Sequence, residues 1–293
     1  EVVLPSGTAT LKISGASLSL GSDLKVYFLV NPAVLAENAY TDVHFVFTIG
    51  ERVVEVSDYV VVNGYYNYIL PGISPRMMND NIHVQLYGTY AGEEYVVEYD
   101  YQASTYCYSQ LGKSSTAATL KTLIVDLLNF ATEHQNYMSY NLANPVNGKL
   151  TDAQKALGSS GELTLTNYLT LTGTDNGASL RGANLYLNDA VIVHFTVKCE
   201  DLTGVTLKVV VAGQEYNIPS SSFVASDEAN VYNIEFRDVS ARQMREVFTA
   251  VVCRDGVEIS KTATYSIESY AASKISNASL SALLKAMMYY GDS

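Results

Sequence analysis

The hydrophobic and polar residues of this chain follow two periods, one typical of helices and one typical of strands. Between residues 117 and 141 apolar side chains recur every three to four positions, which predicts an amphipathic helix over 117–141. The end of the chain repeats this spacing, which predicts a second, shorter helix. The two apolar stripes are Leu120, Leu123, Ile124, Leu127, Leu128 and Ala131, and Leu280, Leu283, Leu284, Met287, Met288 and Tyr290.

Upstream of each helical stretch, short segments alternate between apolar and polar residues. Residues 24–30 alternate strictly and stop at Asn31-Pro32, and residues 43–49 alternate into Gly50. The other expected strands are 8–14 and 16–20, separated at Gly15, one or two strands within 53–62, and 66–70, 82–86 and 95–101, with a hairpin turn at Ala91-Gly92. About seven or eight short strands separated by turns predict an antiparallel sandwich of immunoglobulin-like type.

The segments before the second helix match those before the first, one by one. Phe28 corresponds to Phe195 and Tyr66 corresponds to Tyr232. The offset between the copies changes where loops are expected, and loops tolerate insertions. The sequence therefore predicts one module written twice.

We predict a mainly β fold of two tandem immunoglobulin-like antiparallel β-sandwich modules, each closed by a C-terminal amphipathic α-helix. The first module is 1–141, a connector is 142–160, and the second module is 161–293 with a truncated helix. Each helix must bury its apolar stripe, either on its own sandwich or between the modules. We expect its own sandwich, because no further module follows the second helix in this sequence.

Some matched positions lie outside the strand cores. Ser74-x-Arg76-x-Met78 recurs as Ser240-x-Arg242-x-Met244, which predicts a serine-capped helical turn with a buried methionine. The arginine would pair with a carboxylate or with carbonyl groups, and a ligand-binding arginine is the alternative. The matched tyrosines are Tyr101 and Tyr265, expected in the cores, and Tyr106 and Tyr270, expected to seat a linking segment on each sandwich.

The end of the first helix carries a resemblance. Residues 133–141, with Gln135, Tyr137 and Tyr140-Asn141, resemble the helix tail Gln-x-Tyr-Phe-Gly-Tyr-Asn of a module that recurs in large secreted surface proteins of anaerobic Gram-positive gut bacteria. Residues 150–155 are similar to the connector that follows it there. The likeness covers nearly the whole chain, although Met138 and Ser139 stand where the pattern has Phe-Gly. It implies a surface location and a modular, non-catalytic role.

Composition narrows the class of partner. The net charge of −12 disfavours nucleic acid and anionic membranes, both of which require clustered lysine and arginine. Only 16% of residues are charged, whereas tyrosine is abundant and tryptophan is absent, a composition that we associate with secreted proteins. No apolar run is long enough to span a membrane, and no signal peptide precedes Glu1. We therefore expect a piece of a longer precursor that continues beyond Ser293, secreted or attached to the cell surface.

The candidate chemistry is sparse. The histidines His44, His83, His134 and His194 are scattered, and the three cysteines have no metal-site spacing. We expect three free thiols, with a Cys199–Cys253 disulfide as the alternative. Calcium could bind the oxygen-rich segments 79–81 and 175–177, but turn formation explains both without a metal. We assign no catalytic, cofactor-binding or metal-binding residue, and we expect folding to need no metal.

Three functions remain open: a structural or adhesive module pair, a carbohydrate-binding pair of sandwiches, and an enzyme. The first is favoured, with an unknown extracellular protein or glycan as partner and a monomeric chain. Tyr65 and Tyr87 could stack on sugars, but we expect them on different sheets. The outward pairs Glu98/Thr262 and Asp100/Thr264 differ between the copies. We therefore expect any ligand to bind one module, or the junction 141–155, and we do not expect two equal sites.

Overall fold

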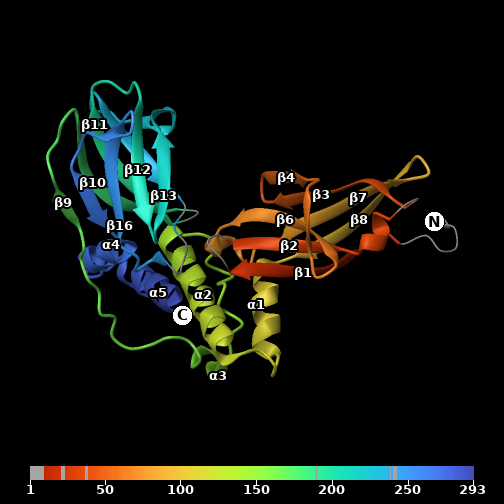
Figure 1. Ribbon diagram of the computed structural model, residues 1–293. Coiled ribbons are helices and arrows are strands. Elements are labelled where there is room, and N and C mark those ends of the chain that lie inside the picture. The colour runs from red at the N-terminus through yellow and green to blue at the C-terminus, as the bar shows by residue number, and fades with distance from the viewer. Residues whose placement is uncertain (1–9, 21–23, 37–38, 189–190, 238, 240–242) are drawn as a thin grey trace. The chain divides into compact units, whose positions relative to one another are not determined.

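The computed structural model describes residues 10–20, 24–36, 39–188, 191–237, 239 and 243–293 (Figure 1). Over these ranges the chain is mainly β, as predicted, and its strands form four antiparallel sheets. The chain divides into two compact units. The first contains Glu1–Thr132 and Asn141–Leu157, and the second contains Glu133–Tyr140 and Gly158–Ser293.

The strands of the first unit follow the predicted alternation closely. Every second residue of 24–30 is buried, because successive side chains of a strand point to opposite faces. The strands are β1 (Ile13–Leu20), β2 (Leu24–Val30), β3 (Thr41–Ile49), β4 (Arg52–Val56), β5 (Tyr59–Val62), β6 (Tyr65–Ile73), β7 (Ile82–Tyr90) and β8 (Glu93–Tyr101). Gly15 does not separate two strands as predicted. It lies at a register shift inside β1, where the β1–β2 pairing bulges.

The first unit has two sheets, with strand orders β1-β2-β6-β5 and β4-β3-β7-β8. Phe28 of β2 packs against Phe47 of the other sheet with ring centroids 5.0 Å apart. Tyr68 of β6 packs against Phe45 at 4.8 Å. The core therefore lies between the two sheets, and the unit is a β-sandwich.

Helices follow the last strand of the first unit. They are α1 (Ala103–Gly112), α2 (Ala118–Met138) and the short α3 (Asp152–Lys155), with 3₁₀ turns at Pro32–Val34 and Pro75–Met77. α1 was expected to be a linking segment. Its buried residues Ala103, Ser104, Cys107 and Leu111 do lie on one helical face, but two of them are small and one is polar, so the hydrophobic pattern conceals the helix.

α2 is the predicted amphipathic helix, with Ile124, Leu127, Leu128 and Ala131 fully buried. It ends at Met138 and not at Asn141. Ser139 takes a left-handed φ of 52°, and Tyr140 N–H donates to Gln135 O at 2.9 Å, which is the hydrogen bond of a Schellman motif. Glycine is the usual residue at this position because it has no Cβ penalty.

Residues 141–157, which include most of the predicted connector 142–160, belong to the first unit. Tyr108 Oη donates to Val146 O at 2.6 Å, and Asn147 N donates to Thr132 Oγ1 at 2.9 Å. Thr151 and Gln154 form a capping box that starts α3. Hydrogen bonds to α1 and α2 therefore hold this segment on its own unit.

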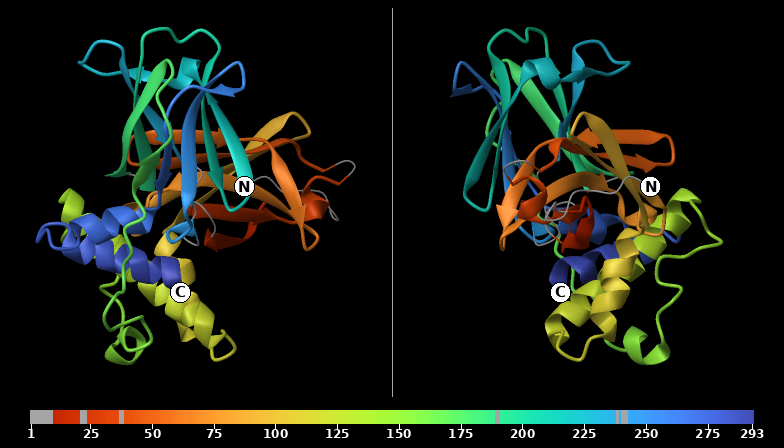
Figure 2. Two further views of the ribbon diagram at one scale, coloured as in Figure 1. Left: turned by 60° about the vertical axis from the view of Figure 1, so that its left-hand side comes forward. Right: turned by 90° about the vertical axis from the view of Figure 1, so that its right-hand side faces the viewer.

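The second unit has the sheet orders β10-β11-β15-β14 and β13-β12-β16-β18-β9, with β17 paired to β16. Its helices α4 and α5 contact each other and lie at one end of its strands (Figures 1 and 2). The strands are β9 (Thr170–Thr172), β10 (Ala178–Leu187), β11 (Val191–Cys199), β12 (Val205–Val211), β13 (Gln214–Pro219), β14 (Val224–Ala225), β15 (Val231–Phe236), β16 (Phe248–Arg254), β17 (Val257–Glu258) and β18 (Thr262–Tyr265), and the helices are α4 (Ile267–Lys274), α5 (Ser281–Asp292) and a 3₁₀ turn at Ser220–Ser222.

α5 is the second predicted helix. All six residues of its expected stripe, from Leu280 to Tyr290, are buried. Tyr289 Oη donates to Gly161 O at 2.6 Å, within the second unit. α5 therefore contacts its own unit, and the expectation that it covers the sandwich of that unit stays a prediction.

The strand pairings of the two units correspond residue by residue. Phe28 pairs with Ala16 and Tyr68, and Phe195 pairs with Ala183 and Ile234. Each unit also has a register shift at the corresponding glycine. It lies next to Gly15 in the β1–β2 pairing and next to Gly182 in the β10–β11 pairing. At the other sheet, Ile82 pairs with Tyr101 and Phe248 pairs with Tyr265. Both units therefore use the same strand order and corresponding pairings, except that β9 is added and the counterpart of β8 is divided into β17 and β18, with a register shift between them.

Candidate functional site

The histidines lie on four different elements. His44 on β3 stacks on Tyr87 of β7 with ring centroids 5.0 Å apart. His83 Nδ1 lies 3.0 Å from Asp100 Oδ1, and hydrogen bonds from Asn81 and from His83 hold the pKa of Asp100 below its ordinary value. His194 belongs to β11, and His134 is buried in α2. Within the described ranges, no three His, Cys, Asp or Glu side chains are grouped so that they could hold a metal ion.

The two oxygen-rich segments considered for calcium, 79–81 and 175–177, both form hydrogen bonds within the protein. Asn79 Oδ1 accepts from Ser104 Oγ at 2.6 Å, while Asn81 Nδ2 donates to Asp100 at 2.9 Å. Asp175 Oδ1 accepts from the backbone N–H of Lys261 at 2.9 Å. These side chains point to different partners, so the geometry is that of turns and strand connections.

All three cysteines are free and buried. Cys199 Sγ donates to Asp201 O at 3.0 Å, and the alternative Cys199–Cys253 disulfide does not form. Burial raises the pKa of the Cys107 thiol to about 12, and burial also raises the pKa of Cys253. A buried thiol with a raised pKa is a poor nucleophile.

We therefore expect the native protein to react with no more than a trace of a thiol reagent such as DTNB, and the denatured, unreduced protein to titrate three thiols. The titration needs no mutation, and the denatured sample is its own control. A count of one in the denatured protein would reveal a disulfide and contradict this description.

The Ser-x-Arg-x-Met turn is partly as expected. Met78 is fully buried and Ser74 occupies the N-cap position of the 3₁₀ turn, but the Ser74 side chain makes no capping hydrogen bond. Met244 is buried in the second unit. Ser240 and Arg242 lie outside the described residues. Tyr101 and Tyr265 are buried in the cores as predicted, and burial raises the pKa of both phenols.

Immediately after each buried methionine, a polar side chain reaches the helix that follows the last strand. In the first unit Asn79 bonds Ser104 of α1, and Ser104 N–H donates to Met78 O at 2.9 Å. In the second unit Arg245 Nη1 donates to Glu268 Oε1 of α4 at 2.7 Å. Glu268 N–H likewise donates to Met244 O at 2.9 Å. We call Asn79–Ser104 and Arg245–Glu268 the clamp pairs.

Each clamp pair also forms hydrogen bonds with the backbone of a third segment, around residue 145 in the first unit and around residues 164–166 in the second. Asn79 Nδ2 donates to Pro145 O at 3.1 Å, and Arg245 Nη1 donates to Thr164 O at 3.1 Å. Glu268 accepts from Thr166 N–H at 2.9 Å. The sequence did not reveal these pairs, because the two members are more than 20 positions apart and share no residue type between the copies.

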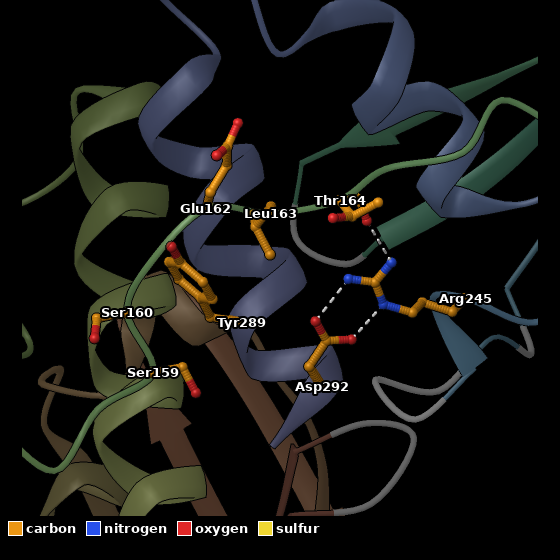
Figure 3. Close-up of a pocket in the computed structure, with 8 residues that line it drawn as sticks. All are labelled: Ser159, Ser160, Glu162, Leu163, Thr164, Arg245, Tyr289 and Asp292. Atoms are coloured by element: carbon orange, nitrogen blue, oxygen red, sulfur yellow. Dashed lines mark hydrogen bonds and ion pairs between the residues drawn. The ribbon is translucent and has the colours of Figure 1, made fainter.

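A cavity of about 440 Å³ lies beside the second clamp pair (Figure 3). Arg245 faces Asp292 of α5 and bonds it through two nitrogens, at 2.5 and 2.7 Å. The Asp292 carboxylate raises the pKa of Arg245, against the effect of partial burial. The lining residues are Ser159, Ser160, Glu162, Leu163, Thr164, Arg245, Tyr289 and Asp292. Because two carboxylates neutralise Arg245, the cavity offers no uncommitted cation for an anionic ligand.

The outward face of β10 and β11 carries a different patch. Tyr186 is 47% exposed, and its ring stacks on the His194 ring with centroids 4.3 Å apart. His194 Nε2 lies 3.1 Å from Glu235, which also pairs with Arg237. Partial burial raises the pKa of Glu235, but hydrogen bonds from His194 and Arg237 outweigh it and hold that pKa below its ordinary value. We call Tyr186, His194, Glu235 and Arg237 the tyrosine patch.

Tyr65 and Tyr87 lie on different sheets, as predicted, since Tyr65 belongs to β6 and Tyr87 to β7. Asn67 of β6 and Asn233 of β15 occupy corresponding positions, but Asn67 is buried and donates to Tyr65 O, so this match is not a shared surface site. In the described ranges, none of the helices combines the length and the apolar character that a membrane span needs.

Comparison with known proteins assigns no family. No family model matches the chain, and no curated protein matches it. Among solved structures, a pullulanase from Anoxybacillus sp. LM18-11 and the same enzyme complexed with maltotriose are similar, each at 11% sequence identity and a TM-score of 0.19. The matches cover 83% and 84% of this chain, which spans about a quarter (24% and 25%) of those chains. A TM-score this low does not indicate that this chain and the pullulanase share a fold or a function.

Proposed function

We propose that this chain is a pair of tandem immunoglobulin-like modules with a structural or adhesive role in a secreted, cell-surface protein, and that it is not an enzyme. The observation that carries the proposal is a contrast between the cores of the two units and their surfaces. The two units have the same strand order and corresponding pairings, whereas their outward side chains differ.

The strand orders support the immunoglobulin-like part of the proposal. The order β1-β2-β6-β5 opposite β4-β3-β7-β8 places consecutive strands in two packed antiparallel sheets with crossovers between them, which is the Greek-key arrangement of such domains. The second unit repeats both orders with β10-β11-β15-β14 and β13-β12-β16-β18.

The outward side chains differ between the units, and this supports a role in binding partner molecules. Asp100 pairs with His83 in the first unit, whereas the corresponding β16–β18 pair is Thr249 and Thr264. Selection on an active site preserves reacting groups, whereas these units retain the residues that pack and vary the others.

The surface location rests on the helix tail. Ser139, which stands where the bacterial surface-protein pattern has glycine, takes the left-handed φ of 52° that glycine adopts freely. A left-handed residue at this position is compatible with the glycine of the pattern, and membership in that group of modules remains part of the proposal.

The experiment is a binding panel with the full chain, using mucin, extracellular-matrix proteins and a glycan array. We expect binding to at least one component and no release of sugar or peptide from it. Turnover of any glycoside or peptide in the panel would contradict a non-catalytic role.

The tyrosine patch favours carbohydrate as a second candidate ligand. An exposed tyrosine ring can stack on a sugar face while neighbouring charged side chains bond its hydroxyl groups. If the glycan array gives the strongest binder, Tyr186→Ala should abolish the signal. Tyr99→Ala is the matched control, because Tyr99 is 46% exposed, close to Tyr186, but lies on β8 of the first unit.

A further inference from the structure

β5 is an unprotected edge strand. It ends the sheet order β1-β2-β6-β5, and no other described strand pairs with its free side. All four residues, Tyr59, Val60, Val61 and Val62, are exposed, and none is charged. Natural sheets shorten or charge such edges to prevent pairing with other chains, so an uncharged β-branched edge indicates an interaction surface.

The backbone of β5 has groups available for pairing. Asn63 and Gly64 both have positive φ, at 49° and 77°, which is a type I′ turn closing the β5–β6 hairpin. The turn makes Val62 and Tyr65 a hydrogen-bonded pair, and pairs alternate along an antiparallel ladder. The N–H and C=O groups of Tyr59 and Val61 therefore point away from β6, toward the free edge.

The corresponding edge of the second unit is protected. β14 has only two residues, and Val224 pairs with Asn233 as Val60 pairs with Asn67. Asp227 and Glu228 follow it closely, and Glu228 forms a bidentate ion pair with Arg181. The contrast within one chain shows that this fold does not require a long apolar edge here.

We propose that β5 pairs antiparallel with β5 of a second copy of this chain, around a two-fold axis at Val60. This register places Val60 opposite Val60 of the other copy and Tyr59 opposite Val61, so that the outward backbone groups of both strands bond each other. Asp58 then lies opposite Val62, and no like charges face each other across the two strands. This self-complementarity favours a second copy over an unrelated extended peptide.

The inference replaces the monomer expected from sequence and is independent of the proposed function. A four-residue edge is a small interface, so the dimer is weak. The net charge of −12 opposes association, and salt screens that repulsion. The dimer should therefore strengthen between low and physiological ionic strength.

The test is sedimentation equilibrium of the full chain over a wide concentration range. We expect the apparent mass to rise toward twice 31.9 kDa. Val60→Lys places two lysines opposite each other and should raise the dissociation constant roughly tenfold. Val224→Lys is the matched control, since Val224 is 62% and Val60 44% exposed, and it should leave the dissociation constant unchanged.

An equimolar mixture of Val60→Lys and Val60→Glu chains provides the rescue, because opposite charges then face each other. We expect this mixture to recover a dissociation constant near that of the unmutated chain. A monomeric unmutated chain, an equal effect of Val224→Lys, or a mixture that stays monomeric would each overturn the proposal. Unchanged melting temperatures would exclude misfolding as the cause of a lost dimer.

Discussion

Replacing Phe28 with alanine is expected to lower the free energy of unfolding of the first unit by about 3–5 kcal/mol, and Phe195→Ala is expected to do the same to the second. Both rings are fully buried, and both occupy the same place in the strand pairing of their sheets. Truncation removes buried apolar surface and leaves a cavity that close-packed neighbours cannot fill. Urea denaturation followed by tyrosine fluorescence and circular dichroism measures both effects.

Val53→Ala is the control, because Val53 is well exposed on β4 and should change stability by less than about 0.5 kcal/mol. If one phenylalanine proved as tolerant as Val53, the two positions would not be equivalent, and the description of the units as copies would fail.

Arg245→Met is expected to destabilise the second unit by about 2–3 kcal/mol. It removes the ion partner of Glu268, whose side chain is only 5% exposed, and an unpaired buried carboxylate is costly. This loss of stability is smaller than for a fully buried ion pair, because the Arg245 side chain is 37% exposed and water screens its charge. Arg245→Met also releases Thr164 and Asp292.

The double variant Arg245→Met/Glu268→Gln separates these effects. A neutral glutamine can still accept from Thr166 N–H, so the double variant should regain part of the lost stability. If it were no more stable than Arg245→Met, the unpaired charge would not be the cause. Thermal melts of the three proteins at neutral pH decide the matter.

The strands were predictable because their alternation is local. Residues 24–30 and 43–49 bury every second side chain, and a period of two is visible within a few positions. The two apolar stripes were predictable for the same reason. α1 was missed because its buried face consists mainly of small and polar residues, which carry no hydrophobic period.

The clamp pairs and the β5 edge could not be predicted from sequence, because each depends on contacts between distant segments. Asn79 and Ser104 meet only when α1 folds back onto the turn after β6, and nothing in either residue type indicates the other. β5 was expected as a strand, but its place at the end of a sheet depends on the order of all the strands.

Isothermal titration calorimetry of the full chain with the strongest binder from the panel of mucin, matrix proteins and glycans distinguishes a non-catalytic contact module from an enzyme. Two units with a shared core and different surfaces should give at most one high-affinity site per chain, with no heat of turnover. Two equivalent sites per chain, or continuing heat from conversion of the ligand, would contradict the account.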